Sequence, residues 1–125
     1  MNYLKKLLFC CTLFAFTAAA LTAQEAKNAL LIANGDYPDE IGDLPKPIPE
    51  AEALKAALES IGFEVTLVKD ADKETIVETL QHFKAKTGKV GGIAFFHYGG
   101  HAVQVNGINY LLPALTKIED ESDRK

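Results

Sequence analysis

Apolar residues along this chain form short continuous runs, and stretches with the period of a helix separate them. Residues 28–34 (NALLIAN) are apolar through their middle and are followed by the turn residues NGDYP, which predicts a strand buried on both faces. Residues 63–70 (FEVTLVKD) and 91–98 (GGIAFFHY) predict two further strands. The segment VQVNGINYLL predicts a β-hairpin, because Asn-Gly at 106–107 is the strongest two-residue turn signal.

Two amphipathic stretches lie between the predicted strands. In the first, Pro49 suits the first helical position and Gly62 suits the stop, and the apolar face consists of Ala51, Leu54, Leu58 and Ile61. In the second, Asp72 is expected to cap the N-terminus and Gly88 to lie just beyond the last turn, with an apolar stripe of Ile76, Leu80 and Phe83. The order strand, helix, strand, helix, strand predicts an α/β fold.

Such a fold has right-handed crossovers, a parallel sheet and helices on both faces. We expect the strand order 2-1-3, which places the loop after the first strand (NGDYPDEIGDLP) beside the loop after the third (GGHAVQ). Ligands bind beyond the carboxyl ends of parallel strands, where the strand order reverses. The pattern alone therefore predicts a site that holds Asn34, Asp36 and His101, without naming its reaction.

The first 23 residues follow the order of a secretory signal peptide. MNYLKK supplies two lysines, the apolar run spans residues 7–21, and small residues stand at 18–20 and 23. That run is shorter than the roughly 20 residues of a membrane-spanning helix, so we expect cleavage rather than a stable membrane anchor. Lipidation at Cys10 is disfavoured because the bulky Phe9 stands where a small residue is needed. The sequence therefore predicts an exported protein, periplasmic or extracellular.

Removal of this leader would change the chemistry of the chain. The 125 residues are enough for one small domain, and both cysteines, Cys10 and Cys11, lie in the leader. The mature protein would then have neither a disulfide nor a thiol nucleophile. Its formal net charge would change from −4 to −6, with 11 basic and 17 acidic residues. An acidic chain without a basic stripe argues against nucleic acid and anionic membranes as partners.

Four segments in order, ALLIANGDYP, PEAEAL, IGFEV and FFHYGGHAVQVNGINYLLP, resemble the caspase-like cysteine peptidases of clan CD. This family includes caspases, metacaspases and their bacterial relatives. The resemblance covers residues 29–113, and its most specific part is YGGHAVQVNGINYLLP. It implies a caspase-like three-layer sandwich with flavodoxin-like topology, of which residues 24–116 form a part. It also implies proteolysis of a peptide or protein substrate, without a cofactor.

The resemblance implies roles for individual residues. In the family, a histidine that ends the third strand acts as general base or acid to a cysteine on the next strand, so His101 is the expected catalytic residue. Backbone N–H groups near it hold the oxyanion, which points to Ala102. The family commonly has glycine there, so this donor requires a backbone that alanine can adopt. Glu50 lies where metacaspase-like relatives carry an acidic S1 residue, which selects a basic residue before the cut bond.

The resemblance leaves the nucleophile unaccounted for. In the family, the chain continues past YLLP through a charged connection to the strand that bears the cysteine. We interpret residues 117–125 (KIEDESDRK) as the beginning of that connection. The expectation is the N-terminal portion of a secreted caspase-like endopeptidase, inactive as it stands. The third strand would then lack a partner on one edge, so this edge is predicted to allow self-association.

Other interpretations remain open at this stage. The chain could be a non-catalytic caspase-fold module that binds partners, or an unrelated flavodoxin-like domain that binds a small anion, although it has no GxGxxG or GxxxxGK loop. Asn34 and Asp36 could serve only to shape their loop, and Glu50 could serve only to stabilise a helix N-terminus. His97 and His101 are four residues apart, but two ligands without a third are poor grounds for a metal site, and none is predicted.

Overall fold

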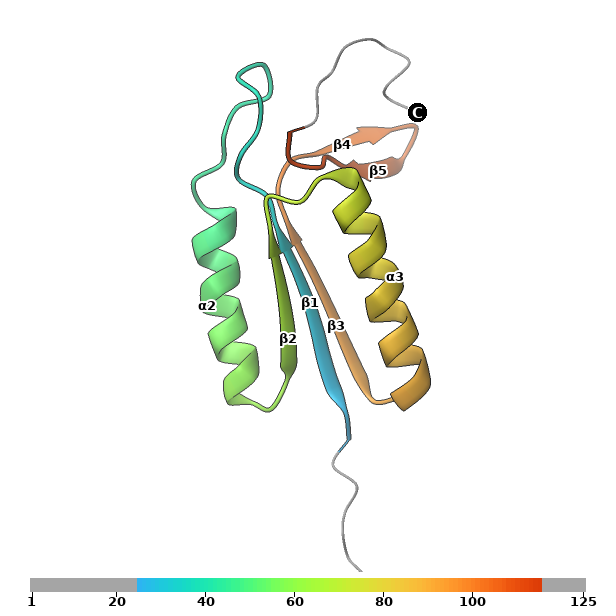
Figure 1. The fold of residues 1–125 in the computed structure, drawn as a ribbon. Coiled ribbons are helices and arrows are strands. Elements are labelled where there is room, and N and C mark those ends of the chain that lie inside the picture. Colours follow the sequence, from blue (N-terminus) through green and yellow to red (C-terminus); the bar gives the residue numbers. More distant parts are fainter. Residues whose placement is uncertain (1–24, 116–125) are drawn as a thin grey trace, which may run out of the picture.

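A computed structural model describes residues 25–115 of the chain (Figure 1). Its elements, in chain order, are β1 (Lys27–Ala33), α2 (Pro47–Ser60), β2 (Glu64–Lys69), α3 (Lys73–Val90), β3 (Ile93–Gly99), β4 (Ala102–Val105) and β5 (Ile108–Leu111). The predicted signal peptide (1–23) and charged tail (117–125) lie outside the described residues. Neither described helix is both long and apolar enough to cross a membrane.

Strand β1 is the centre of a three-stranded parallel sheet in the order β2-β1-β3. In this register Leu31 lies opposite Leu67 of β2 and His97 of β3. Helix α2 covers one face of the sheet and α3 covers the other, which makes three layers (Figure 1). The structure therefore confirms the predicted α/β fold, the strand order and the helices on both faces.

The side chains of β1 alternate between two cores, as the pleat of a strand requires. Ala29 and Leu31 pack with Leu58 on the α2 side, whereas Leu30 and Ile32 belong to the cluster on the α3 side. Each of these four β1 residues has at most 1% of its surface exposed. Burial of one large apolar side chain stabilises the fold by about 2 kcal/mol. This two-sided burial explains the continuous apolar run in the sequence.

Helix α2 begins two residues earlier than predicted, at Pro47 rather than Pro49. Both prolines fit, because the N–H groups of the first turn have no acceptor within the helix. The helix ends at Ser60, so Ile61 lies just beyond it with 60% of its surface exposed. The prediction that Ile61 belongs to the apolar face is therefore wrong.

Helix α3 begins as predicted and ends later. The Asp72 carboxylate accepts a hydrogen bond from Thr75 N–H at 2.8 Å, and its contact with Thr75 holds the pKa of Asp72 below the usual value. The predicted end at Gly88 is wrong, because the helix continues to Val90 and stops at Gly91. Gly88 costs a helix only about 1 kcal/mol, whereas Gly91 has a φ of 67°, which a right-handed helix cannot continue.

The predicted hairpin is confirmed. β4 pairs antiparallel with β5, with Val105 opposite Ile108. Asn106 and Gly107 both have positive φ, 51° and 79°, as a type I′ turn requires. The hairpin forms a two-stranded sheet of its own, which lies over the carboxyl end of the parallel sheet (Figure 1).

Candidate active site

The loops that follow β1 and β3 lie together at the carboxyl end of the sheet, next to the hairpin (Figure 1). The ladder between the two strands extends into this region, because Asn34 N–H donates to Gly99 O at 2.8 Å. The N-terminus of α2 approaches the same place, since a Cβ on Gly99 would lie 3.3 Å from Pro47 Cβ. The fold thus brings the loop after β1, the first turn of α2 and His101 to one end of the molecule.

The imidazole of His101 is held by a backbone carbonyl. Its Nε2 lies 2.8 Å from the carbonyl O of Gly42. A carbonyl oxygen can only accept a hydrogen bond, so Nε2 carries the hydrogen when the neutral ring makes this contact. Nδ1 then has the free lone pair, and it is the nitrogen that can take a proton from a neighbouring acid.

The direction of the Gly42 carbonyl is set by a tight loop. The N–H groups of Ile41 and Gly42 both donate to Pro38 O, at 2.8 and 2.9 Å. Gly42 has a φ of 89°, in the left-handed region that other residues rarely adopt. This glycine, which sequence reasoning did not single out, therefore supports the contact to His101. Its signal in the sequence is only that of an ordinary turn residue.

Two tyrosines surround the backbone of His101. The His101 N–H donates to Tyr37 Oη at 3.0 Å, and the His101 carbonyl O lies 3.1 Å from Tyr98 Oη. The ring of Tyr37 also meets the imidazole nearly at right angles, with the centroids 4.7 Å apart. Gly100 passes between the two hydroxyl groups, and a Cβ there would lie 2.6 Å from each oxygen. With the tyrosines in these positions, there is no room for a side chain at Gly100, the second glycine of YGGH.

The N–H of Ala102 points away from the partner strand of the hairpin. Leu112 N–H donates to His101 O at 3.0 Å, which makes Ala102 and Leu111 a non-hydrogen-bonded pair of the ladder. In such a pair each N–H faces outward. Ala102 is not among the described non-glycine residues with positive φ, so its backbone is one that alanine adopts readily. Its role as an oxyanion donor stays a prediction, and this geometry is compatible with it.

The two predicted loop residues lie in different settings. Asn34 is fully buried: its Oδ1 accepts from Ala71 N–H at 2.9 Å, and its Nδ2 donates to Ala71 O at 3.2 Å. These bonds tie the end of β1 to the segment before α3, which favours the loop-shaping interpretation of Asn34. Asp36 is exposed, and its N–H donates to Asp70 Oδ1 at 2.9 Å. Contact of either residue with a substrate stays a prediction.

Asp70 is an organising residue that sequence reasoning missed. Its Oδ1 also accepts from Gly35 N–H, at 2.8 Å, so one carboxylate oxygen orders two residues of the loop after β1. Asp70 itself has a φ of 45°. Aspartate tolerates this region and bonds backbone N–H groups of turns, which is a usable local signal. Its partners, however, are more than 30 residues away in the chain.

Glu50 lies in the first turn of α2 with an exposed side chain. Within residues 25–115 its carboxylate has no hydrogen bond or ion pair. The position suits a carboxylate that favours the helix N-terminus, and it also leaves the carboxylate available to a ligand. Both interpretations of Glu50 therefore stay predictions.

Comparison with known families decides the class of this domain. The family model described as the caspase domain, of peptidase family C14, matches residues 26–121. This chain belongs to the caspase domain family. A comparison with curated proteins finds no match. The family assignment confirms the resemblance seen in YGGHAVQVNGINYLLP and its neighbouring segments.

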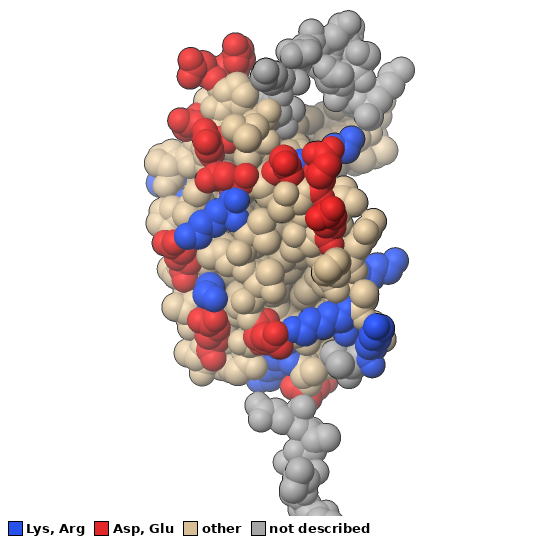
Figure 2. Space-filling view, viewed as in Figure 1, with Lys and Arg blue, Asp and Glu red and all other residues tan. Residues whose placement is uncertain are grey.

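Acidic side chains gather toward the carboxyl end of the sheet in this caspase domain (Figure 2). The loop after β1 alone contains four: Asp36, Asp39, Glu40 and Asp43. Fixed negative charge raises the local concentration of cationic ligands and repels anionic ones. Among the described residues, no group of three or more His, Cys, Asp and Glu side chains is arranged to hold a metal ion.

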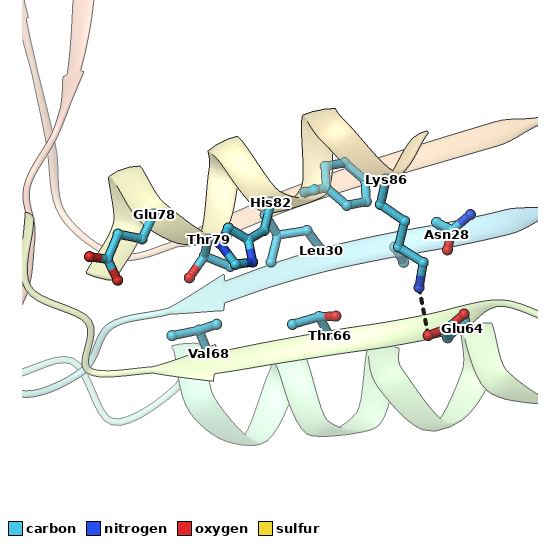
Figure 3. Close-up of a pocket in the computed structure, with 11 residues that line it drawn as sticks. Asn28, Leu30, Glu64, Thr66, Val68, Glu78, Thr79, His82 and Lys86 are labelled. Carbon is cyan, nitrogen blue, oxygen red and sulfur yellow. Dashed lines mark ion pairs between the residues drawn. The ribbon is translucent and has the colours of Figure 1, made fainter. Parts of the chain in front are cut away.

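A separate hollow of about 470 Å³ lies between α3 and β2 (Figure 3). Glu64 of β2 and Lys86 of α3 form an ion pair across it. Its other polar lining residues include Thr66, Thr79 and the exposed His82. It contains none of the site residues predicted from the sequence, and its cationic group Lys86 is already paired. The hollow is therefore not part of the His101 site.

Proposed function

We propose that His101 is the proton-transfer residue of a caspase-type cysteine peptidase site. The contact between its Nε2 and the Gly42 carbonyl carries this proposal, because it leaves Nδ1 as the basic nitrogen at the carboxyl end of the sheet. Membership of the caspase domain family supports cysteine peptidase chemistry for the complete site. The exposed loops at this end can receive a peptide from solvent.

In this mechanism, Nδ1 of His101 takes the proton of a cysteine thiol, and the thiolate attacks the carbonyl carbon of the substrate. A C–S bond forms and the carbonyl electron pair moves to oxygen, where Ala102 N–H donates to the developing charge. The imidazolium then gives its proton to the leaving amine as the C–N bond breaks. Water, activated by the same histidine, releases the acyl group. The Gly42 carbonyl stabilises the imidazolium because it accepts from Nε2–H throughout.

The nucleophile must come from outside the described residues, since the sequence has no cysteine after Cys11. We infer that the 125-residue chain by itself does not hydrolyse peptides. The purified chain should show no turnover of Arg- or Lys-ended peptide substrates above a His101→Ala control, and thiol-directed inhibitors should label no residue beyond Cys11. Turnover above that control would require a different nucleophile and would contradict the proposal.

We propose a preference for a basic residue before the cut bond, which Glu50 and the acidic loop after β1 support. The test joins the chain to the cysteine-bearing segment of a caspase-family relative. Glu50→Gln should then lower kcat/KM by about tenfold or more for Arg and Lys substrates, because a charge-assisted hydrogen bond is lost, and less for neutral ones. Glu59→Gln, at the other end of α2, is the control. Equal losses for all substrates would assign Glu50 to helix stabilisation.

Export is proposed from the leader-like pattern of residues 1–23. The basic start, the short apolar run and the small residues near position 23 support it. Cell fractionation and N-terminal sequencing test the proposal. A mature N-terminus near residues 21–24 in an exported fraction is expected, and an uncleaved chain in the cytoplasm would contradict it.

We also propose that the outer edge of β3 pairs with a second copy of the chain. Within residues 25–115, β3 pairs with β1 alone. Phe96 and Ile93 on this strand have 45% and 43% of their surface exposed. A strand edge with exposed apolar side chains invites a further strand.

A further inference from the structure

We propose that Tyr37 and Tyr98 are positioning residues for His101. Tyr37 holds the backbone N–H of His101 and packs against the edge of its ring, and both hydroxyl groups hold Leu112, whose N–H donates to the His101 carbonyl. The inference deepens the proposed function and rests on it. Sequence analysis assigned neither tyrosine to the site. The proposal follows from the contacts that the two tyrosine hydroxyl groups make with the residues at the two ends of the hairpin, His101 and Leu112.

The hydroxyl of Tyr37 has two partners besides its neighbouring tyrosine. It accepts from His101 N–H at 3.0 Å and donates to Leu112 O at 3.1 Å. The side chain of Tyr37 is almost fully buried, so no water replaces either bond readily. One hydroxyl thereby joins the residue that enters the hairpin to the residue that leaves it. The ring above it restricts the imidazole, with an angle of 73° between the planes.

The hydroxyl of Tyr98 completes the arrangement from the other side. It donates to Leu112 O at 2.6 Å, lies 3.1 Å from His101 O, and lies 3.3 Å from Tyr37 Oη. A carbonyl oxygen has two lone pairs, so Leu112 O can accept from both tyrosines at once. Burial, followed by the hydrogen bond to Tyr37, raises the pKa of Tyr98, so the phenol keeps the proton that it donates.

Together with Gly42 and Leu112, these contacts hold His101 at four points: its N–H, its C=O, which accepts from Leu112 N–H, the edge of its ring and Nε2. The direction of Nδ1 is then determined by the fold before any nucleophile or substrate arrives, which is the preorganisation that proton transfer needs. Loss of the Tyr37 hydroxyl would leave the partly buried His101 N–H without its acceptor and loosen the position of the imidazole. A tyrosine that served only to fill space could be replaced by phenylalanine without either effect.

The test is NMR spectroscopy of the ¹⁵N-labelled full chain. Imidazole nitrogen shifts distinguish the Nε2–H and Nδ1–H tautomers, and a His101→Gln variant identifies the His101 signals. The native chain should show the Nε2–H form. Tyr37→Phe should give a mixture of tautomers and speed exchange of the His101 amide about tenfold relative to the Leu31 amide, which reports global opening. Tyr98→Phe should change the tautomer signals in the same direction, by less.

Tyr110→Phe is the matched control, because this tyrosine is exposed on β5 and belongs to no part of the site. His101 signals in Tyr37→Phe and Tyr98→Phe that are the same as in Tyr110→Phe would overturn the inference. If Tyr37→Phe does not fold, Tyr98→Phe decides by the same criterion. The readout needs no peptide cleavage, so a correctly positioned His101 that fails the cleavage test would overturn the proposed function and leave the positioning intact.

Discussion

Gly100 runs between the hydroxyl groups of Tyr37 and Tyr98, with 2.6 Å from each oxygen to the place of a Cβ. Gly100→Ala must displace at least one tyrosine, so we expect it to lower the free energy of unfolding by about 1–3 kcal/mol. Gly88→Ala is the matched change, since a Cβ there meets nothing within 4 Å and alanine favours the helix by about 1 kcal/mol. Urea denaturation of both variants measures the difference. Unchanged stability in Gly100→Ala would mean that the tyrosines are not held.

Among single residues, the sequence pointed to His101, which stands in the strongest motif, but not to the residues that contact it in the structure. His101 stands in a family pattern that is visible in one line of sequence. Gly42 contacts the imidazole of His101 through a backbone carbonyl, and Tyr37, which lies 64 residues away in the chain, accepts from the His101 N–H through its hydroxyl. Neither contact produces a recognisable pattern in the sequence around His101. Asn34 was predicted as a polar loop residue, whereas its burial against Ala71 depends on the position of the segment before α3.

The two edge strands of the sheet differ in how well their edges are protected. β2 carries Glu64 and Lys69, and each pairs with a helix, through Lys86 of α3 and Glu52 of α2. Charged residues of this kind discourage further strands. β3, with the sequence IAFFHYG, has no lysine, arginine or carboxylate. The edge of β3 is therefore the one at which a second chain is expected to pair.

Substitutions at Phe95 and Phe96 of β3 can distinguish an effect on folding from an effect on association. Phe95 packs into the core on the α2 side, with its ring 6.4 Å from that of Phe63, whereas Phe96 is 45% exposed. Phe96→Lys should convert self-associated chain to monomer with little change in stability. Phe95→Lys should destabilise the fold by about 3 kcal/mol or more. Sedimentation and thermal unfolding measure both effects. A native chain that is monodisperse, with a sharp unfolding transition, would contradict association and favour a stand-alone binding module.

At the element scale, the sequence predicted which segments are strands and helices better than where they end. The continuous apolar run predicted β1, and the Asn-Gly pair predicted the turn of the hairpin. Both predictions are confirmed. The end of α3 was predicted wrongly because either of two glycines, Gly88 or Gly91, could end the helix. Only Gly91 has a backbone that ends a helix, and this depends on how the chain enters β3.

For the whole molecule, the order of strands and helices was enough to predict the parallel sheet, because right-handed crossovers leave few arrangements. The family was predicted from a different signal, the resemblance of YGGHAVQVNGINYLLP and its neighbouring segments. The same strand order predicted that the loop after β1 lies beside the loop that carries His101, and the contact between His101 and Gly42 agrees with this. The negative charge that this loop brings to the site was not interpreted from the sequence.

We propose that His101 transfers the proton in a caspase-type site. The most direct measurement is peptide cleavage by the chain joined to the cysteine-bearing segment of a caspase-family relative, with His101→Ala compared against His82→Ala. His82 is an exposed imidazole on α3 and serves as the control. We expect His101→Ala to lower kcat by about 10²- to 10⁴-fold and His82→Ala to leave it unchanged. Equal kcat in the two variants would contradict it.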